Sequence, residues 1–369
     1  MYKVGITGQK GFMGSHLFNF LGLKEDIQLI PYDKAMFDND DLLMSFVQQC
    51  DVIVHLAAMN RHEDQNVIHD TNISLVQKLI QACTRVNHNP TILFSSSTQE
   101  HLDNLYGKSK KKGGAMLEEW ANTSGARIVN MVIPNVFGPF GKPKYNSVVA
   151  TFCHAIARGE TPSIINYSVV KLIYVNELID HIYQYITTNI SGKVEVPHYH
   201  EIKVSTLLEK LLHFKQIYMD EKSFPSISDA TDLALFNTFR CYIPEDFYPV
   251  KFKNNIDNRG NFVEIAKTNS VGQFSFSTTL PGVTRGNHFH TRKAERFAVI
   301  KGKASIKLRK VDKTEVVEYI LDGNEPAYVD MPIWYTHNIT NIGDDELLTL
   351  FWINEPYDPN DPDTYFVNV

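Results

Sequence analysis

The start of the chain places a glycine-rich loop between a strand-like run and a helical pattern. Residues 2–7 have the apolar character of a buried strand, and apolar side chains recur at helical spacing over residues 15–23. Glycines in such a loop let the backbone turn tightly and approach a pyrophosphate at the N-terminus of the helix. The order of strand, loop and helix predicts a doubly wound parallel α/β fold of the Rossmann type that binds a dinucleotide. The residues expected to contact the cofactor here are Gly8, Gly11, Phe12, Met13 and Gly14.

The next two strand-like runs predict the rest of the cofactor site. Residues 27–32 end at Asp33, and an acidic residue at that point accepts ribose hydroxyls and favours NAD. Lys34 and Arg61 could instead meet the 2′-phosphate of NADP, so the sequence leaves both cofactors open. Residues 51–58 form a third expected strand, and the small side chains at its end would let the cofactor lie close to the sheet. The expected contacts there are Leu56, Ala57 and Ala58.

A tyrosine and a lysine follow the fourth expected strand, residues 91–97. Tyr106 and Lys110 are four residues apart, which puts both side chains on one face of a helix. The lysine charge is expected to lower the pKa of the phenol, so that the tyrosine protonates a carbonyl oxygen while hydride reaches its carbon. Tyrosine and lysine recur at this spacing elsewhere in the chain, but only Tyr106 follows a core strand that ends in serines.

These segments resemble the extended short-chain dehydrogenase/reductases. The resemblance rests on the glycine loop, on HLAA at residues 55–58 and on the tyrosine–lysine pair. It implies an NAD(P)-dependent reductase of nucleotide sugars, in which Ser97 holds the substrate oxygen, with Ser96 as the alternative. Asn72 is expected to open the next helix, where this family has an Asn that braces the active site. The interval from Ser97 to Tyr106 is short for this family, which predicts a trimmed loop.

The character of the sequence changes after residue 243. Residues 244–251 hold two prolines and an acidic pair, and they are expected to link a first domain, residues 1–243, to a second, residues 252–369. The second domain consists of short alternating runs separated by turns, which is the pattern of an antiparallel sandwich or jelly roll. The expected strands include residues 274–280, 297–302, 304–310, 314–321 and 347–353.

Two histidines and a glutamate are closely spaced in the second domain. His288 and His290 alternate, so on a strand both imidazoles leave the same face, and Glu295 lies five residues further on. Two imidazoles and a carboxylate that converge on one point suit a borderline divalent metal. His337 is the candidate for the fourth ligand.

The metal-ligand segments resemble the cupin family. The first cupin motif is matched at every spacing by Gly282, the first three ligands and Gly302. The second motif, around the fourth ligand, is only partly present, because Trp334 stands where the family has glycine. Residues 257–266 and 284–290 also resemble the RmlC-like sugar 3,5-epimerase branch of the cupins. This resemblance implies a metal-binding jelly roll that acts on a nucleotide sugar.

The proton carrier of such an epimerase is left open. The RmlC-like branch usually works without metal and uses a histidine at the position of His288 as its base. A His288 that binds metal is poorly placed for that role, so the proton is expected to pass through another group. Lys293, Tyr335 and Arg285 flank the two motifs and are the candidates.

The combination of the two domains resembles the fused reductase–cupin enzymes of capsular polysaccharide synthesis. It implies a UDP-2-acetamido-2,6-dideoxy-4-keto-hexose substrate, epimerisation at C3 in the cupin and reduction at C4 by NADPH, with NADH also possible. The order is forced by chemistry, because the C4 ketone makes the C3 proton acidic and reduction destroys that ketone. The resemblance also implies zinc, a homodimer and a UDP-N-acetyl-L-talosamine-type product on the way to UDP-N-acetyl-L-fucosamine. An iron dioxygenase and a non-catalytic cupin are the alternatives.

Composition excludes several other classes of function. The net charge is −6 without a long run of one sign, so nothing indicates nucleic-acid binding. No apolar run approaches the roughly 20 residues that a membrane span needs. The first residues pass directly into a strand pattern, so no signal peptide is expected. The four cysteines are scattered, as in a reduced cytoplasmic protein.

Overall fold

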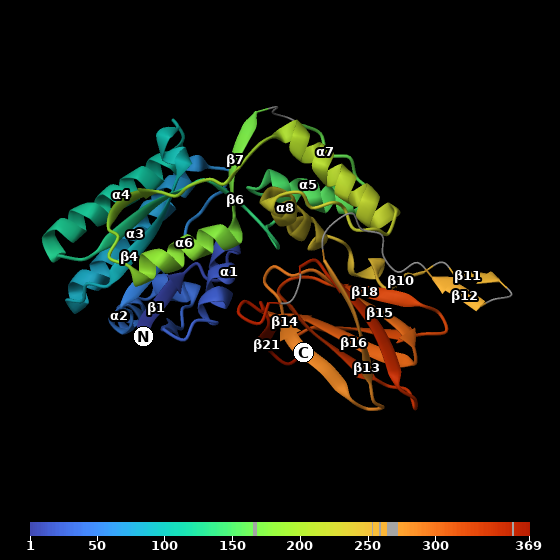
Figure 1. Cartoon of the computed structure of the whole chain (residues 1–369). Helices are drawn as coiled ribbons and strands as arrows, with labels where there is room; N and C mark the ends of the chain where they lie inside the picture. The colour runs from blue at the N-terminus through green and yellow to red at the C-terminus, as the bar shows by residue number, and fades with distance from the viewer. Residues whose placement is uncertain (165–167, 253, 258–259, 264–271, 356–357) are drawn as a thin grey trace. The chain divides into compact units, whose positions relative to one another are not determined.

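The computed structural model describes residues 1–164, 168–252, 254–257, 260–263, 272–355 and 358–369 (Figure 1). The chain divides into two compact units. The first comprises residues 1–151 and 165–204, and the second comprises residues 152–164 and 205–369. No helix among the described residues combines the length and the apolar character that crossing a membrane requires.

The first unit is built on a six-stranded sheet in the order β2-β1-β3-β4-β5-β8, in which all neighbours are parallel. Strands β3 and β5 are buried along their whole length. They are continuously apolar apart from single polar residues because helices cover both faces of a parallel sheet. The strands are β1 (Tyr2–Thr7), β2 (Ile27–Ile30), β3 (Val52–His55), β4 (Thr91–Ser97), β5 (Ile128–Ile133) and β8 (Gly192–Glu195).

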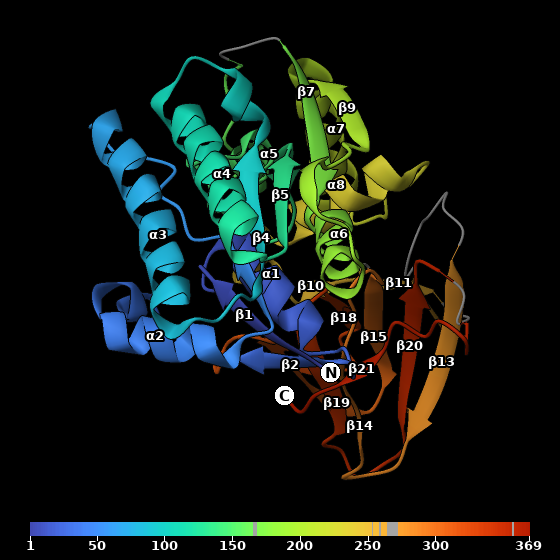
Figure 2. The ribbon, with the colours of Figure 1, turned by 90° about the vertical axis from the view of Figure 1, so that its left-hand side faces the viewer.

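Helices α2, α3 and α4 cover one face of this sheet, and α1 and α6 lie on the other (Figure 2). The core on the first face joins Phe46, Leu79 and Leu117 of the three helices to Ile53 and Phe94 of the strands. The helices are α1 (Phe12–Leu21), α2 (Asp40–Gln49), α3 (Gln65–Val86), α4 (Leu105–Ser124) and α6 (Val175–Thr187). A second sheet of the unit has the order β6-β7-β9, with strands Asn135–Phe137, Val169–Tyr174 and His200–Lys203. Helix α5 (Val148–Ala157) crosses from the first unit into the second.

The second unit contains two five-stranded antiparallel sheets, β10-β18-β15-β20-β13 and β17-β16-β19-β14-β21. Alternation along the strands sends apolar side chains of both sheets into one core that includes Val299, Ile306, Val329 and Ile339. The first sheet has β10 (Val250–Lys251), β13 (Gln273–Thr279), β15 (Glu295–Lys301), β18 (Ala327–Met331) and β20 (Leu347–Ile353). The second has β14 (Thr284–Phe289), β16 (Lys303–Lys310), β17 (Val316–Asp322), β19 (Tyr335–Asn341) and β21 (Tyr365–Phe366). A separate pair, β11 (Asn254–Asp257) and β12 (Gly260–Val263), completes the strands.

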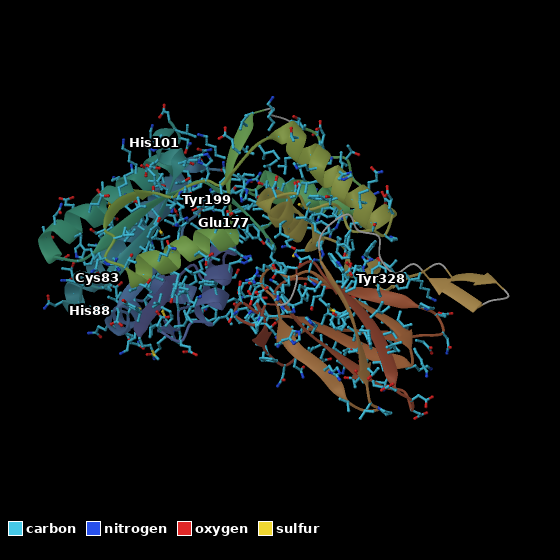
Figure 3. The ribbon with its side chains drawn as sticks, viewed as in Figure 1. Cys83, His88, His101, Glu177, Tyr199 and Tyr328 are labelled. Atoms are coloured by element: carbon cyan, nitrogen blue, oxygen red, sulfur yellow. The ribbon has the colours of Figure 1, made fainter. Side chains whose placement is uncertain are left out.

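The helices that follow residue 204 pack on the outer face of the β15–β18 sheet. Arg296 of β15 is fully buried and forms an ion pair of 2.8 Å with Asp330 of β18, and the Tyr218 hydroxyl donates to the same carboxylate. The Arg296 guanidinium also lies 3.7 Å from the ring centroid of Tyr328, which is labelled in Figure 3. The helices are α7 (Val204–Phe214), the π-helix η3 (Lys215–Asp220) and α8 (Ala230–Arg240).

The predicted fold class, a parallel α/β part followed by an antiparallel β part, is confirmed. All five strands expected after residue 270 are present, within two residues of their predicted ends. The predicted linker, residues 244–251, folds as the short helix η4 (Glu245–Phe247) and as β10, which pairs with β18. The domain boundaries at 243 and 252 remain a prediction. The compact units change over after residues 151, 164 and 204. Part of residues 257–266 lies outside the described residues.

Candidate functional site

The glycine loop closes tightly against the end of β3. Gly8 has a positive φ of 76°, and a Cβ there would lie 2.9 Å from the backbone nitrogen of Ala57. A Cβ on Gly14 would lie 2.2 Å from the carbonyl oxygen of Gly8. Gly11 caps α1 without a side-chain hydrogen bond, which leaves the first N–H groups of the helix available to an anion. Phe12 and Met13 form the first turn of that helix.

Asp33 lies after β2 and has two partners. Its Oδ1 accepts from the backbone N–H of Ala35 at 2.9 Å, and its Oδ2 lies 3.4 Å from Nζ of Lys10. The hydrogen bond from Ala35 and the Lys10 charge hold the pKa of Asp33 below its usual value. More than half of the side chain is exposed, so its oxygens are open to a ribose. Lys10 is a cation that the sequence interpretation missed, although it stands inside the glycine loop itself.

The remaining predicted cofactor residues lie in two places. Lys34 opens the short helix η1 (Lys34–Asp38) next to Asp33 and is exposed. The Arg61 guanidinium donates to the carbonyl oxygen of Lys144 at 2.7 Å and so lies with a different loop. At the end of β3 the backbone N–H of Ala57 donates to the Thr7 hydroxyl at 3.3 Å. Leu56 is buried, and Ala57 and Ala58 are half-buried.

The predicted Tyr–Lys pair lies at the start of α4. Asn104 caps this helix by accepting from the backbone N–H of Gly107 at 2.7 Å. Nζ of Lys110 lies 5.8 Å from the ring centroid of Tyr106, so the two side chains share one face as predicted. The same Nζ donates to the Ser95 hydroxyl at 3.4 Å, which ties the pair to the end of β4.

The pKa values of this pair differ from the expectation. Burial lowers the pKa of Lys110 to about 7, and burial, with a smaller contribution from Tyr145, raises the pKa of Tyr106 to about 12. The expected lowering of the phenol pKa is therefore wrong for the protein alone. Desolvation of the phenolate by burial is the largest cause of this difference.

Strand alternation separates the three serines at the end of β4. Ser95 and Ser97 lie on the same side of the strand as Lys110, and Ser96 lies on the other side, where its hydroxyl donates to Glu100 at 2.5 Å. This geometry favours Ser97 over Ser96 as the partner of a substrate oxygen. Ser97 also accepts from the backbone N–H of Gln99 at 3.2 Å and so starts the next turn.

The short interval before Tyr106 folds as the 3₁₀ helix η2 (Thr98–His101). Glu100 anchors this turn, since its buried carboxylate pairs with Lys193 as well as with Ser96. The expected trimmed loop is thus a tight turn that an ion pair ties to β8. Glu100 is a residue that the sequence interpretation missed, because its partner on β8 is distant in the chain.

Asn72 lies in the middle of α3, not at the start of a helix as expected. The helix begins at Gln65, and the buried Asn72 amide bonds both backbone groups of Met59, at 2.7 and 3.1 Å. It also donates to the Ser109 hydroxyl of α4 at 3.1 Å. Asn72 therefore links the chain after β3 to the helix that carries Tyr106.

The four predicted metal ligands converge between the two sheets of the second unit. His288 and His337 face each other across the β14–β19 pair, and Glu295 begins β15 of the opposite sheet. His290 follows directly after β14. One ligand atom from each of the four residues lies within 4.8 Å of the other three.

The charge and hydrogen bonding of this cluster suit a cation. Nε2 of His290 lies 3.1 Å from Oε2 of Glu295, and Nε2 of His337 lies 3.3 Å from the same oxygen. Nε2 of His337 is buried, and its contact with Glu295 lacks the geometry of a good hydrogen bond. Burial opposes ionisation of Glu295, but the two histidines outweigh it and hold the pKa of the carboxyl well below its usual value. Burial lowers the pKa of His288 to about 4, so this imidazole is neutral and able to bind a metal.

The predicted proton carriers lie around this cluster with partners of their own. Lys293 is buried, and its Nζ donates to the carbonyl oxygen of Pro362 at 2.7 Å. Tyr335 is two residues before His337 on β19 and packs against the core. Arg285 donates to the Thr279 hydroxyl at 3.0 Å.

Two family models match the chain. The model of the NAD dependent epimerase/dehydratase family matches residues 4–196. The model of the polysaccharide biosynthesis C-terminal domain matches residues 255–365, the part that contains all four metal-ligand candidates.

Full-length similarity extends to a curated protein and to solved structures. The chain is 34% identical over 372 residues to the UDP-2-acetamido-2,6-beta-L-arabino-hexul-4-ose reductase of Pseudomonas aeruginosa, covering 100% of this chain and 99% of that one. It is 34% identical to the capsular polysaccharide assembling protein CapF from Staphylococcus aureus, with a TM-score of 0.64 and 100% of both chains covered. A structure of CapF with the inhibitor 3-isopropenyl-tropolone is 33% identical, with a TM-score of 0.60 and the same coverage.

Proposed function

We propose, from the premise that this chain belongs to the NAD dependent epimerase/dehydratase family, that it reduces the C4 ketone of a UDP-2-acetamido-2,6-dideoxy-4-keto-hexose. The single observation that carries the proposal is the pairing of Tyr106 with a buried Lys110 on α4, where Lys110 also bonds Ser95 at the end of β4. The named activity of the 34% identical Pseudomonas aeruginosa protein supports the substrate class. NADPH is the proposed cofactor, with NADH as the other possibility.

The reductase roles follow from the side chains. A nicotinamide cofactor, when bound, would supply the hydride that C4 receives. Tyr106 donates its proton to the C4 oxygen, which completes the conversion of ketone to alcohol. Ser97 holds that oxygen, and Lys110 stabilises the phenolate that Tyr106 becomes after it gives up its proton. Gly8, Gly11 and Gly14 bring the pyrophosphate to the backbone of α1.

We further propose that the second unit epimerises the same substrate at C3 before the reduction. His288, His290, Glu295 and His337 would hold a divalent metal, proposed as zinc, which would supply Lewis-acid chemistry beside the sugar. Lys293 and Tyr335 are the proposed proton carriers at C3. We propose that the protein acts as a homodimer in the cytoplasm, in capsule biosynthesis.

The test uses the full-length protein and a UDP-4-keto-6-deoxy-N-acetylhexosamine in D2O, with and without NADPH. Tyr106→Phe is expected to lower the rate of ketone reduction at C4 by a factor on the order of 10²–10⁴. Deuterium exchange at C3 is expected to stay intact. Chelation and His290→Ala are expected to remove both metal and exchange. The matched controls are Tyr199→Phe, which has a lysine at the same spacing, and His198→Ala.

Three results would contradict the proposal. Normal reduction by Tyr106→Phe would remove this residue from the reductase site. Exchange at the wild-type rate in a folded, metal-free protein would confine the metal to a structural role. Oxygen consumption coupled to substrate loss would indicate a dioxygenase instead.

A further inference from the structure

The described end of the chain, residues 358–369, runs along β14, the strand that carries His288. Within it, β21 pairs with β14 (Figure 1). In this pair Phe366 stands opposite His288. The backbone N–H of Val367 donates to the carbonyl oxygen of Asn287 at 2.9 Å. The tail therefore forms the outer edge of the sheet that carries two of the four ligands.

Asp363 of this tail closes the turn between His290 and Glu295. Its buried carboxylate accepts from the backbone N–H groups of Thr291, Arg292 and Lys293 at 3.0–3.3 Å. The Thr291 hydroxyl donates to Oδ1 of the same carboxylate at 2.6 Å. Three consecutive N–H groups that converge on one anion fix the conformation of that turn. The turn sets the distance between two of the proposed ligands.

The backbone of Asp363 also orients one ligand directly. Nδ1 of His290 donates to the carbonyl oxygen of Asp363 at 2.5 Å. A proton on Nδ1 leaves Nε2 with a lone pair, and Nε2 is the atom that faces Glu295. The side chain and the carbonyl of one residue thus control both the turn and the imidazole.

We propose that Asp363 is the positioning residue of the metal centre. It does not contact the metal, but it presents His290 in the correct tautomer and holds Glu295 at ligand distance. Outer partners of this kind are worth about 10- to 100-fold in metal affinity. The inference rests on the proposed metal site, and it adds a residue from a segment that neither cupin motif includes.

The variants are Asp363→Asn and Asp363→Ala in the full-length protein. Asparagine suits the left-handed backbone of this position, where φ is 43°, but its amide N–H₂ would face the N–H groups of the turn. The matched control is Asp361→Asn, because Asp361 lies on the same tail and pairs only with the Arg292 side chain among these groups. Zn²⁺ affinity is measured by competition with a chromophoric chelator, and Co²⁺ absorption reports ligand geometry.

Asp363→Asn is expected to lose about 10- to 100-fold in Zn²⁺ affinity and to change the Co²⁺ spectrum. Asp361→Asn is expected to match wild type in both measurements. With a substrate that already has the epimerised C3 configuration, C4 reduction by NADPH is expected to persist in every variant, which shows that the reductase unit is folded. Wild-type affinity and an unchanged spectrum in both Asp363 variants would overturn the inference while leaving the metal site standing. A wild-type protein that binds no divalent metal would overturn both the inference about Asp363 and the proposed metal site.

Discussion

Lys110 is a titratable side chain that the fold buries almost completely. Burial lowers its pKa from 10.5 to about 7, so below pH 7 the folded protein contains a buried ammonium. Between pH 7 and 10.5 the unfolded chain binds more protons than the folded one, and this group therefore makes stability rise with pH in that window. The residue is thus destabilising at the pH at which it is expected to work.

Lys110→Met is expected to raise the free energy of unfolding at pH 7 by on the order of 2–4 kcal/mol, because it removes this buried charge. The gain should shrink as the pH rises toward 10.5, and C4 reduction should be lost. Urea unfolding at several pH values measures the effect, with the exposed Lys112→Met as the control. A destabilised Lys110→Met protein would show that the ammonium is stabilised where it lies.

Lys10 and Asp33 bear on the choice of cofactor. We expect NADPH to be used at least as well as NADH, because Lys10 and Lys34 lie beside the ribose position that Asp33 marks. Lys10→Ala is expected to raise KM for NADPH about tenfold relative to NADH, since only NADPH carries a phosphate for this cation. Steady-state kinetics with both cofactors checks this, with Lys3→Ala as the control. Strict dependence on NADH in the wild type would mean that Asp33 dominates.

At the scale of elements, the short helix η2 connects Ser97 to the segment before Tyr106. Glu100 anchors this turn. Burial alone would raise the pKa of its carboxyl, but the hydrogen bonds from Lys193 and Ser96 outweigh this effect and lower the pKa. A lowered carboxyl pKa contributes stability above the ordinary value of 4.5, and this stability is lost as the pH falls below it.

Glu100→Gln is expected to reduce stability by about 1–3 kcal/mol at pH 7 and to lower the rate of C4 reduction, because Ser97 and Tyr106 lose their common support. The partly exposed Lys193 can turn to solvent, which keeps the loss moderate. Thermal unfolding and reduction kinetics measure both effects, and the exposed Glu195→Gln is the control. A rate equal to wild type would leave Glu100 with a structural role alone.

Local sequence patterns predict the helices and strands well. They do not predict contacts between residues that are far apart in the chain. Strand β4, the start of α4 and the alternation of His288 and His290 follow from periodicities within a few residues. Asp363 meets Thr291 across 72 residues, and Glu100 meets Lys193 across 93. Nothing in the neighbouring sequence marks either carboxylate as buried. The pKa of Tyr106 was likewise misjudged because burial is a property of the folded chain.

At the scale of the whole molecule, the buried pair of Arg296 and Asp330 joins helices to sheet in the second unit. Arg240 of α8 adds a hydrogen bond of 3.1 Å to the carbonyl oxygen of Met331, next to Asp330. The Tyr248 hydroxyl lies 3.4 Å from the Asp330 carboxylate and 2.7 Å from the Tyr218 hydroxyl. This polar network is complete only when the segment from α7 to β10 and the β15–β18 sheet are both present.

Arg296→Met is expected to destabilise the second unit by about 3–5 kcal/mol, because it leaves Asp330 buried without its partner. The double variant Arg296→Met/Asp330→Leu is expected to recover much of that loss. Denaturant unfolding of both proteins measures the difference, and Lys251→Met, from an exposed pair with Glu325, is the control. Equal losses in the single and double variants would show that the two side chains act independently.

The position of this network also limits how such a chain can have been assembled in evolution. The two family models cover residues 4–196 and 255–365, yet Tyr218, Arg240 and Tyr248 lie between them. A recombination event at the proline-containing segment would transplant the metal-binding sheet without the helices that cover Asp330. A viable chimera would have to inherit residues 205–369 together, with residues 152–164 or a substitute for them. Ancestral exchange of this half between relatives is therefore expected to leave its breakpoints near residue 204.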